Sequence, residues 1–85
     1  MKIKDIRHIE TNETRTDGRY PLRIGSTVDF YAKPFIGFAM MLAYVADNEG
    51  NPKEGILRTS YVKEYTENEK EFIVKTNNSI YILEK

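Results

Sequence analysis

Apolar and β-branched residues in the last third of the chain, 55–85, come in short runs separated by polar clusters. The clusters 66–69 and 76–79 contain Thr, Asn and Ser, whose side chains close turns by hydrogen bonding to nearby backbone. This pattern predicts three antiparallel strands joined by two tight turns: Ile56–Tyr65, Glu71–Thr76 and Ser79–Leu83.

The N-terminal part of the chain has two weaker apolar patterns. Isoleucines at a spacing of three, which fit either a short helix or a strand with a bulge, open the chain: Ile3, Ile6 and Ile9. No capping residue precedes them, so we favour the strand. Alternation over Ser26–Ala32 predicts a half-buried strand, with Val28 and Phe30 on one face.

The segment between these two patterns is polar and carries turn signals. Residues 10–20 are rich in threonine and include Asp17-Gly18, so we expect an exposed loop or a hairpin tip. Pro21 lacks a backbone donor, which places residues 19–24 in a loop or at a sheet edge.

Residues 35–47 form a nearly continuous apolar run that suits either a strand or a helix. Ala, Met and Leu favour a helix, whereas Gly37, the aromatic residues and Val45 favour a strand. We expect a central strand covered on both faces. The two faces would carry Phe38, Met40, Leu42 and Tyr44, and Ala39, Met41, Ala43 and Val45. The alternative is an α+β fold with residues 38–46 helical.

These elements predict one all-β domain spanning residues 1–85. Five or six short antiparallel strands suggest a small SH3-like barrel, with an OB-like barrel as the alternative. The turn at 76–79 followed by Tyr81 is similar to the junction of the last two strands in SH3-like barrels. The chain has no cysteine, so no disulfide can reinforce this small sheet.

The C-terminal third also resembles short uncharacterised proteins of bacteria and their phages. The resemblance lies in the pattern Leu57-Arg58-Thr59-Ser60-x-Val62 and then Val74-x-Thr76-x-Asn78-Ser79-x-Tyr81-x-Leu83. It implies a compact β-domain and a phage or other mobile-element origin. It implies no activity and carries over no catalytic residue.

Charge and composition narrow the expected function. The 13 basic and 13 acidic residues balance, which argues against a general nucleic-acid binder. Four of the five arginines nevertheless lie in residues 1–25. Residues 1–20 show no signal peptide and the longest apolar run is too short to span a bilayer, so we expect a cytoplasmic protein.

The sequence offers no catalytic or metal-binding constellation. His8 is the only histidine, no cysteine can complete a zinc site, and no nucleophile-elbow motif is present. We therefore expect no enzyme activity, no metal and no cofactor.

Binding residues are expected in two places. Arg58-Thr59-Ser60 and the turn at 76–79 would meet near one end of the barrel. The alternative is that they only form a bulge and a turn, with Arg58 paired to a surface acid. Tyr20 and Tyr31 would form an exposed aromatic-basic surface with two arginines. The full candidate set is Arg19, Tyr20, Arg23, Tyr31, Arg58, Thr59, Ser60, Asn77, Asn78 and Tyr81.

Two functions remain open from the sequence. We favour a non-enzymatic binding module that acts through a protein partner or through self-association, with a host-modulating role if the phage resemblance holds. The six tyrosines and an expected open edge at the N-terminal strand support it. The alternative is binding of nucleic acid, a nucleotide or another anion through the arginines and the Thr-Asn-Asn-Ser turn.

Overall fold

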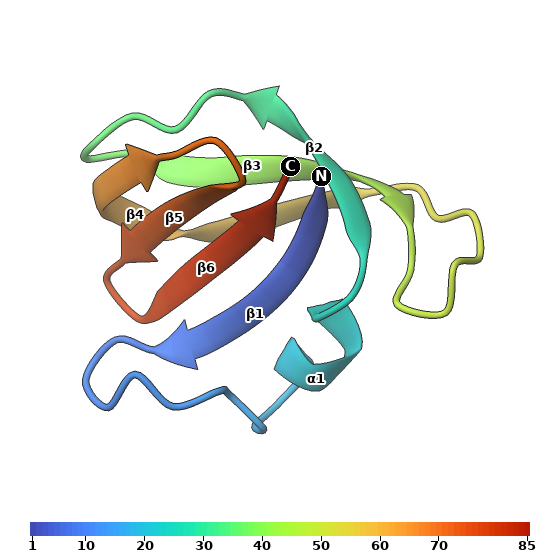
Figure 1. Cartoon of the computed structure of the whole chain (residues 1–85), viewed down its shortest axis with the longest axis horizontal. Coiled ribbons are helices and arrows are strands. Elements are labelled where there is room, and N and C mark those ends of the chain that lie inside the picture. The colour runs from blue at the N-terminus through green and yellow to red at the C-terminus, as the bar shows by residue number, and fades with distance from the viewer.

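Six antiparallel strands close into a barrel in the computed structural model, which describes all 85 residues, and the strand order follows the chain (Figure 1). The strands are β1 (Lys2–His8), β2 (Thr27–Ala32), β3 (Ala39–Ala46), β4 (Ile56–Glu67), β5 (Glu71–Thr76) and β6 (Ser79–Glu84). The predicted all-β class and the three C-terminal strands are confirmed. The choice between the SH3-like and the OB-like type stays a prediction.

β1 closes the barrel by pairing with β6 along its length and with β2 at one end. Its register with β2 is limited to Lys2 opposite Thr27, and the amide of Val28 donates to the carbonyl of Met1 at 2.8 Å. The predicted open edge at the N-terminal strand is therefore wrong. The open edge belongs to β2, because its residues 29–32 pair with β3 alone.

A bulge explains the isoleucine spacing in β1. The register against β6 shifts between Ile3 and Asp5, so an extra residue lies between the two inward positions. Ile3 and Ile6 are consequently both fully buried, although they are three residues apart. The predicted strand with a bulge is confirmed.

The ambiguous apolar run is a strand, but a shorter and more exposed one than expected. Gly37 lies within the turn that precedes β3 and takes the φ of 91° that this turn requires. β3 therefore begins only at Ala39. The helical alternative is wrong, and so is the expectation that Phe38 lies on a covered face of the strand, because Phe38 is 68% exposed. The outer face is also not covered, since Val45 is 49% exposed.

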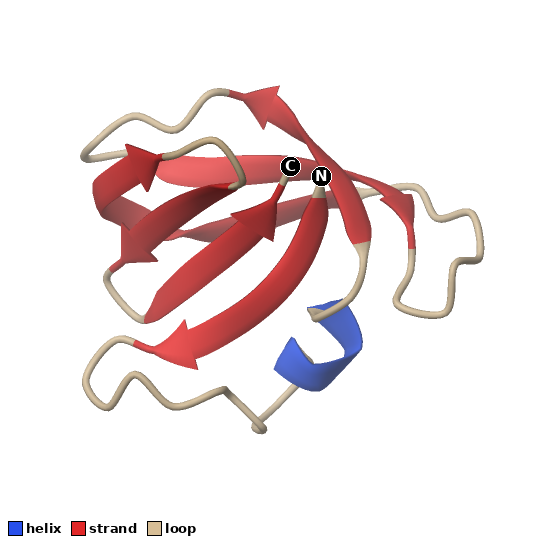
Figure 2. Ribbon diagram, viewed as in Figure 1, coloured by secondary structure: helices blue, strands red, loops and turns tan.

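A single turn of helix, α1 (Tyr20–Arg23), lies where the sequence predicted a loop or a sheet edge (Figure 2). Pro21 stands in its first turn, where a missing donor costs nothing and its fixed φ suits the helix. The preceding residues 10–19 are mostly exposed and without regular structure. The structure contains no helix with the length and hydropathy needed to span a membrane.

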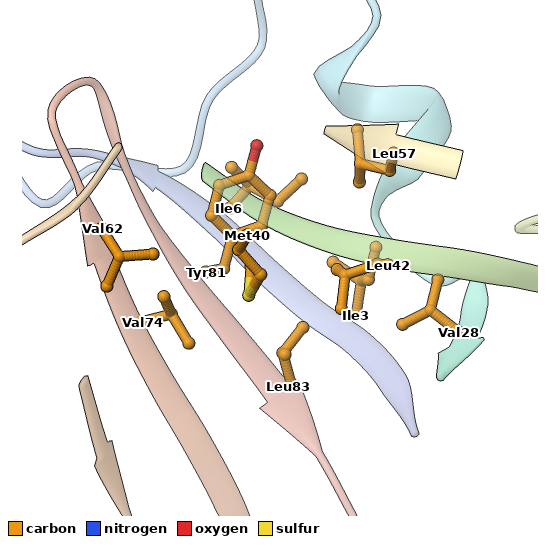
Figure 3. Packing of buried hydrophobic residues seen from close by; sticks show 10 residues of the cluster. All are labelled: Ile3, Ile6, Val28, Met40, Leu42, Leu57, Val62, Val74, Tyr81 and Leu83. Atoms are coloured by element: carbon orange, nitrogen blue, oxygen red, sulfur yellow. The ribbon is translucent and has the colours of Figure 1, made fainter. Parts of the chain in front are cut away.

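Every strand contributes to one hydrophobic core inside the barrel (Figure 3). Its ten buried members are Ile3, Ile6, Val28, Met40, Leu42, Leu57, Val62, Val74, Tyr81 and Leu83. Val28, Met40 and Leu42 are among them, while Phe30 and Tyr44, which were predicted to share their faces, are partly buried and pack against the cluster. The barrel interior is thus filled by side chains.

Two buried hydroxyls in this barrel differ in how they are satisfied. Thr59 Oγ1 accepts the amide of Met40 at 3.0 Å and donates to the carbonyl of Ser60 at 2.7 Å, at a register shift in β4. Ser26 Oγ is buried more deeply than Thr59 but has no hydrogen-bond partner. Of these two hydroxyls, only that of Thr59 is expected to stabilise the fold.

Thr59→Val should lower the free energy of unfolding by about 1–3 kcal/mol, because it leaves the buried amide of Met40 without an acceptor. Urea denaturation measures this change. Ser26→Ala is the matched control, since it removes a hydroxyl that bonds to nothing, and it should leave stability unchanged or raise it by up to about 1 kcal/mol. Equal losses in the two variants would contradict the assigned hydrogen bonds.

Candidate functional site

Two guanidinium groups contact the ring of Tyr20 beside α1. The Cζ of Arg15 lies 4.2 Å from the ring centroid, and that of Arg23 lies 5.2 Å from it. Arg15 is also fixed by a fork of hydrogen bonds to Asp17 at 3.1 and 2.9 Å, and it donates to Ser79 Oγ at 2.8 Å. The Arg15 guanidinium holds the pKa of Asp17 below its ordinary value. Arg15 is therefore largely committed within the chain, whereas Arg23 is not.

A groove with a volume of about 280 Å³ lies between α1 and the neighbouring ends of β3 and β4. We call it the cationic groove; its lining residues are Arg19, Leu22, Arg23, Tyr44, Lys53, Ile56 and Leu57. Arg19 and Arg23 are four residues apart, so one helical turn brings both to the same side of α1. Lys53 comes from the loop between β3 and β4, far from α1 in the sequence.

The cations of this groove form no close ion pair within the chain. The carboxyl group of Asp47 senses one of them, since its pKa is lowered mainly by the amide of Asn51 and, less strongly, by the charge of Lys53. Arg19, Arg23 and Lys53 form no ion pair within 4.0 Å, and no acidic residue lines the groove. The Nζ of Lys53 lies instead 4.2 Å from the ring centroid of Tyr44, whose own pKa is raised by burial. Three lysines elsewhere on the barrel are paired, as in Lys4–Glu71 at 2.8 Å. Others, such as Lys63 and Lys70, form no ion pair, but they line no groove that joins a second cation to an apolar surface.

A second cavity, of about 430 Å³, lies between the loop after β1 and the turn between β5 and β6. Acidic, basic and amide groups all line it, including Glu10, Glu13, Arg15 and Asn78. His8 also borders it, with Nε2 3.7 Å from a carboxylate oxygen of Asp17. The mixed lining favours no single ligand charge. No group of three His, Asp or Glu side chains in the chain could hold a metal ion.

The two predicted polar clusters do lie side by side, but the hydroxyls of Thr59, Thr76 and Ser79 are used internally. The amide of Asn77 donates to the carbonyl of Tyr61 at 3.0 Å, which joins the turn to the bulge in β4. Thr76 Oγ1 accepts the amides of Asn78 and Ser79 at 3.3 and 3.0 Å. The bulge-and-turn interpretation is thus confirmed for the backbone. Arg58 is exposed and forms no ion pair, contrary to that interpretation.

The tyrosine candidates do not form one surface. Tyr81 is only 2% exposed, so its ring belongs to the core and cannot serve as a contact surface. Tyr20 lies in α1, which adjoins the start of β2, whereas Tyr31 lies near the other end of β2 (Figure 1). The expected aromatic-basic surface of Tyr20 and Tyr31 is therefore wrong, and only Tyr20 lies with the arginines.

Sequence reasoning missed two groups of surface residues. Lys53, Tyr44 and Leu22 join the arginines only through the fold, and no spacing in the chain links them. The second group is the apolar rim, of which only Tyr31 was a sequence candidate. It consists of large exposed side chains around the loop between β2 and β3: Tyr31 (65% exposed), Phe35 (66%), Ile36 (65%), Phe38 (68%) and Tyr61 (56%). The glycine within the apolar run was the available signal that part of it forms a turn.

Burial raises the pKa of Tyr81 to about 12 from 10.0. The folded chain therefore binds this proton more tightly than the unfolded chain, so the stabilisation is complete below pH 10 and is lost as the pH rises toward 12. A shift of two units corresponds to about 3 kcal/mol. We expect the urea midpoint to fall more steeply above about pH 10 in the wild type than in Tyr81→Phe. Parallel curves for the two proteins would contradict a buried Tyr81 hydroxyl.

No protein-family model, no curated protein and no solved structure matches this chain. Functional proposals for this chain therefore rest on the chemistry of its own surface residues.

Proposed function

We propose that this chain is a non-enzymatic binding module that associates with a second copy of itself through the apolar rim. The observation that carries the proposal is the exposure of Phe35, Ile36 and Phe38, each about two-thirds accessible to solvent. Large exposed apolar patches are typical of interaction sites, whereas single exposed apolar residues are common on any protein surface.

The rim is an ordered element. The amide of Phe38 donates to the carbonyl of Phe35 at 3.2 Å, which closes a turn with Gly37 at its positive-φ position. The amide of Gly37 donates to the carbonyl of Val62 in β4, and the amide of Val62 donates back to the carbonyl of Phe38, each at 2.8 Å. The three apolar side chains are thus held outward by hydrogen-bonded backbone, which lowers the entropy lost on binding.

The open edge of β2 adjoins the rim and offers a second type of contact. Residues 29–32 pair with β3 on one side only, and Tyr31 lies at a register shift within them. An unpaired strand edge is a template for pairing with another strand. Two copies related by a twofold axis could pair this edge with itself while the two rims cover one another.

Charge favours a second copy as the occupant of the rim. The chain has a formal net charge of zero, so no net electrostatic repulsion opposes the approach of identical molecules. The five rim residues are themselves uncharged.

Light scattering coupled to size-exclusion chromatography tests this function over a range of protein concentrations. The wild type should approach twice the mass of one chain as concentration rises. The double variant Phe35→Ser/Phe38→Ser should remain a monomer with an unchanged far-UV dichroism spectrum, because it removes apolar area that only association would bury.

The matched control is Leu22→Ser/Ile56→Ser, which removes two apolar side chains, 64% and 48% exposed, from the cationic groove. It should associate like the wild type. A wild type that stays monomeric at every concentration, or a control that dissociates as fully as the rim variant, would refute self-association through the rim.

A further inference from the structure

The cationic groove combines three unpaired positive charges with an apolar floor. Arg19, Arg23 and Lys53 supply the charges, and Leu22, Tyr44 and Ile56 supply apolar surface between them. Leu22 and Ile56 are 64% and 48% exposed, so the floor is accessible to a ligand. The groove is separate from the apolar rim and does not depend on self-association.

The loop that carries Lys53 is held in place by its own hydrogen bonds. Asp47 accepts the amides of Glu49 and Asn51, both at 2.9 Å, and these contacts lower the pKa of its carboxyl group. The amide of Lys53 donates to the carbonyl of Val45 at 3.1 Å. Lys53 therefore starts from a fixed backbone position, and the groove exists before any ligand arrives.

Close packing joins this loop to the end of α1. Gly25 follows α1 with φ of 94°, and a Cβ at this position would stand 3.4 Å from the Cβ of Asn48 in the loop. A side chain here would strain the backbone and press against the loop. Glycine thus allows the loop with Lys53 and the turn with Arg23 to approach each other.

The lining selects the chemistry of a ligand. Arginine presents a planar fork of donors that matches a phosphate or carboxylate group, and lysine adds a compact charge. Two guanidinium groups and one ammonium group suit a dianion such as a phosphomonoester better than a single carboxylate. The apolar floor and the Tyr44 ring favour a ligand whose uncharged part is flat or apolar.

We propose that the cationic groove binds a phosphomonoester carried on a flat or apolar group, with the phosphate on Arg19, Arg23 and Lys53. The uncharged part then lies on Leu22, Tyr44 and Ile56. A volume of about 280 Å³ accommodates one such unit at a time. The phosphate could belong to a free mononucleotide or to the end of a single nucleic-acid strand, since both carry the same chemistry.

Isothermal titration calorimetry of the full chain with adenosine 5′-monophosphate, adenosine and inorganic phosphate tests this assignment. The monophosphate should bind saturably, and each of the other two at least tenfold more weakly, because each lacks one half of the complementary surface. No saturable binding of the monophosphate, or equal binding of adenosine, would overturn the proposal. Equal binding of inorganic phosphate would overturn the role of the apolar floor.

Charge-removing variants locate the site. Arg19→Gln, Arg23→Gln and Lys53→Gln should each weaken monophosphate binding by roughly tenfold, as expected for a charge-assisted hydrogen bond worth about 1.5 kcal/mol. Arg58→Gln and Lys70→Gln are matched controls, because both residues are exposed, unpaired and outside the groove lining. They should change binding less than twofold. Equally large losses of affinity in the controls would show that positive charge anywhere on the surface attracts the ligand, and would refute the groove as its binding site.

A ten-residue oligothymidylate, with and without a 5′-phosphate, distinguishes the two sources of phosphate. Tighter binding of the phosphorylated strand than of the mononucleotide, sensitive to Arg23→Gln, supports a strand end as the ligand. Tighter binding of the mononucleotide supports a free nucleotide. If an oligoglutamate peptide binds and none of the phosphate ligands does, the proposal is overturned in favour of an acidic protein segment as the ligand.

Discussion

Closure of the sheet through β1 is the constraint on which the rest of the structure depends. This strand pairs with β6 along its length but reaches β2 only around Lys2 and Met1. The chain has no disulfide, so these contacts and one hydrophobic core hold six strands in a ring. Because the seam between β1 and β2 is short, closure leaves the outer half of β2 without a second neighbour.

Register shifts then decide which side chains the barrel encloses. The shift in β1 keeps Ile3 and Ile6 inside, and the shift in β4 turns Thr59 inward, where its hydroxyl replaces the lost backbone pairing. The shift in β2 places Tyr31 outside the ladder beside the apolar rim. Bulges therefore shape the core and the candidate interaction surface by the same backbone mechanism.

Two surfaces of opposite character result from this arrangement. The cationic groove gathers α1, the loop after β3 and the start of β4, whereas the rim gathers the loop after β2 and the middle of β4. The groove is positively charged and the rim is apolar, whereas the chain as a whole is neutral in charge. The balanced total reveals neither surface, because no acidic residue lines the groove while the acidic residues lie elsewhere on the chain.

The sequence by itself determined the strands, since alternation and turn-forming residues act locally: β5 begins and ends where predicted, and Asn77 and Asn78 form the turn before β6. It also predicted Arg19 and Arg23 as binding candidates. Only the tertiary structure decided that Tyr81 is core, that Tyr31 lies far from Tyr20, and that Lys53 completes the groove. Burial and long-range proximity depend on how the strands close around the core, and no local pattern in the chain specifies that closure.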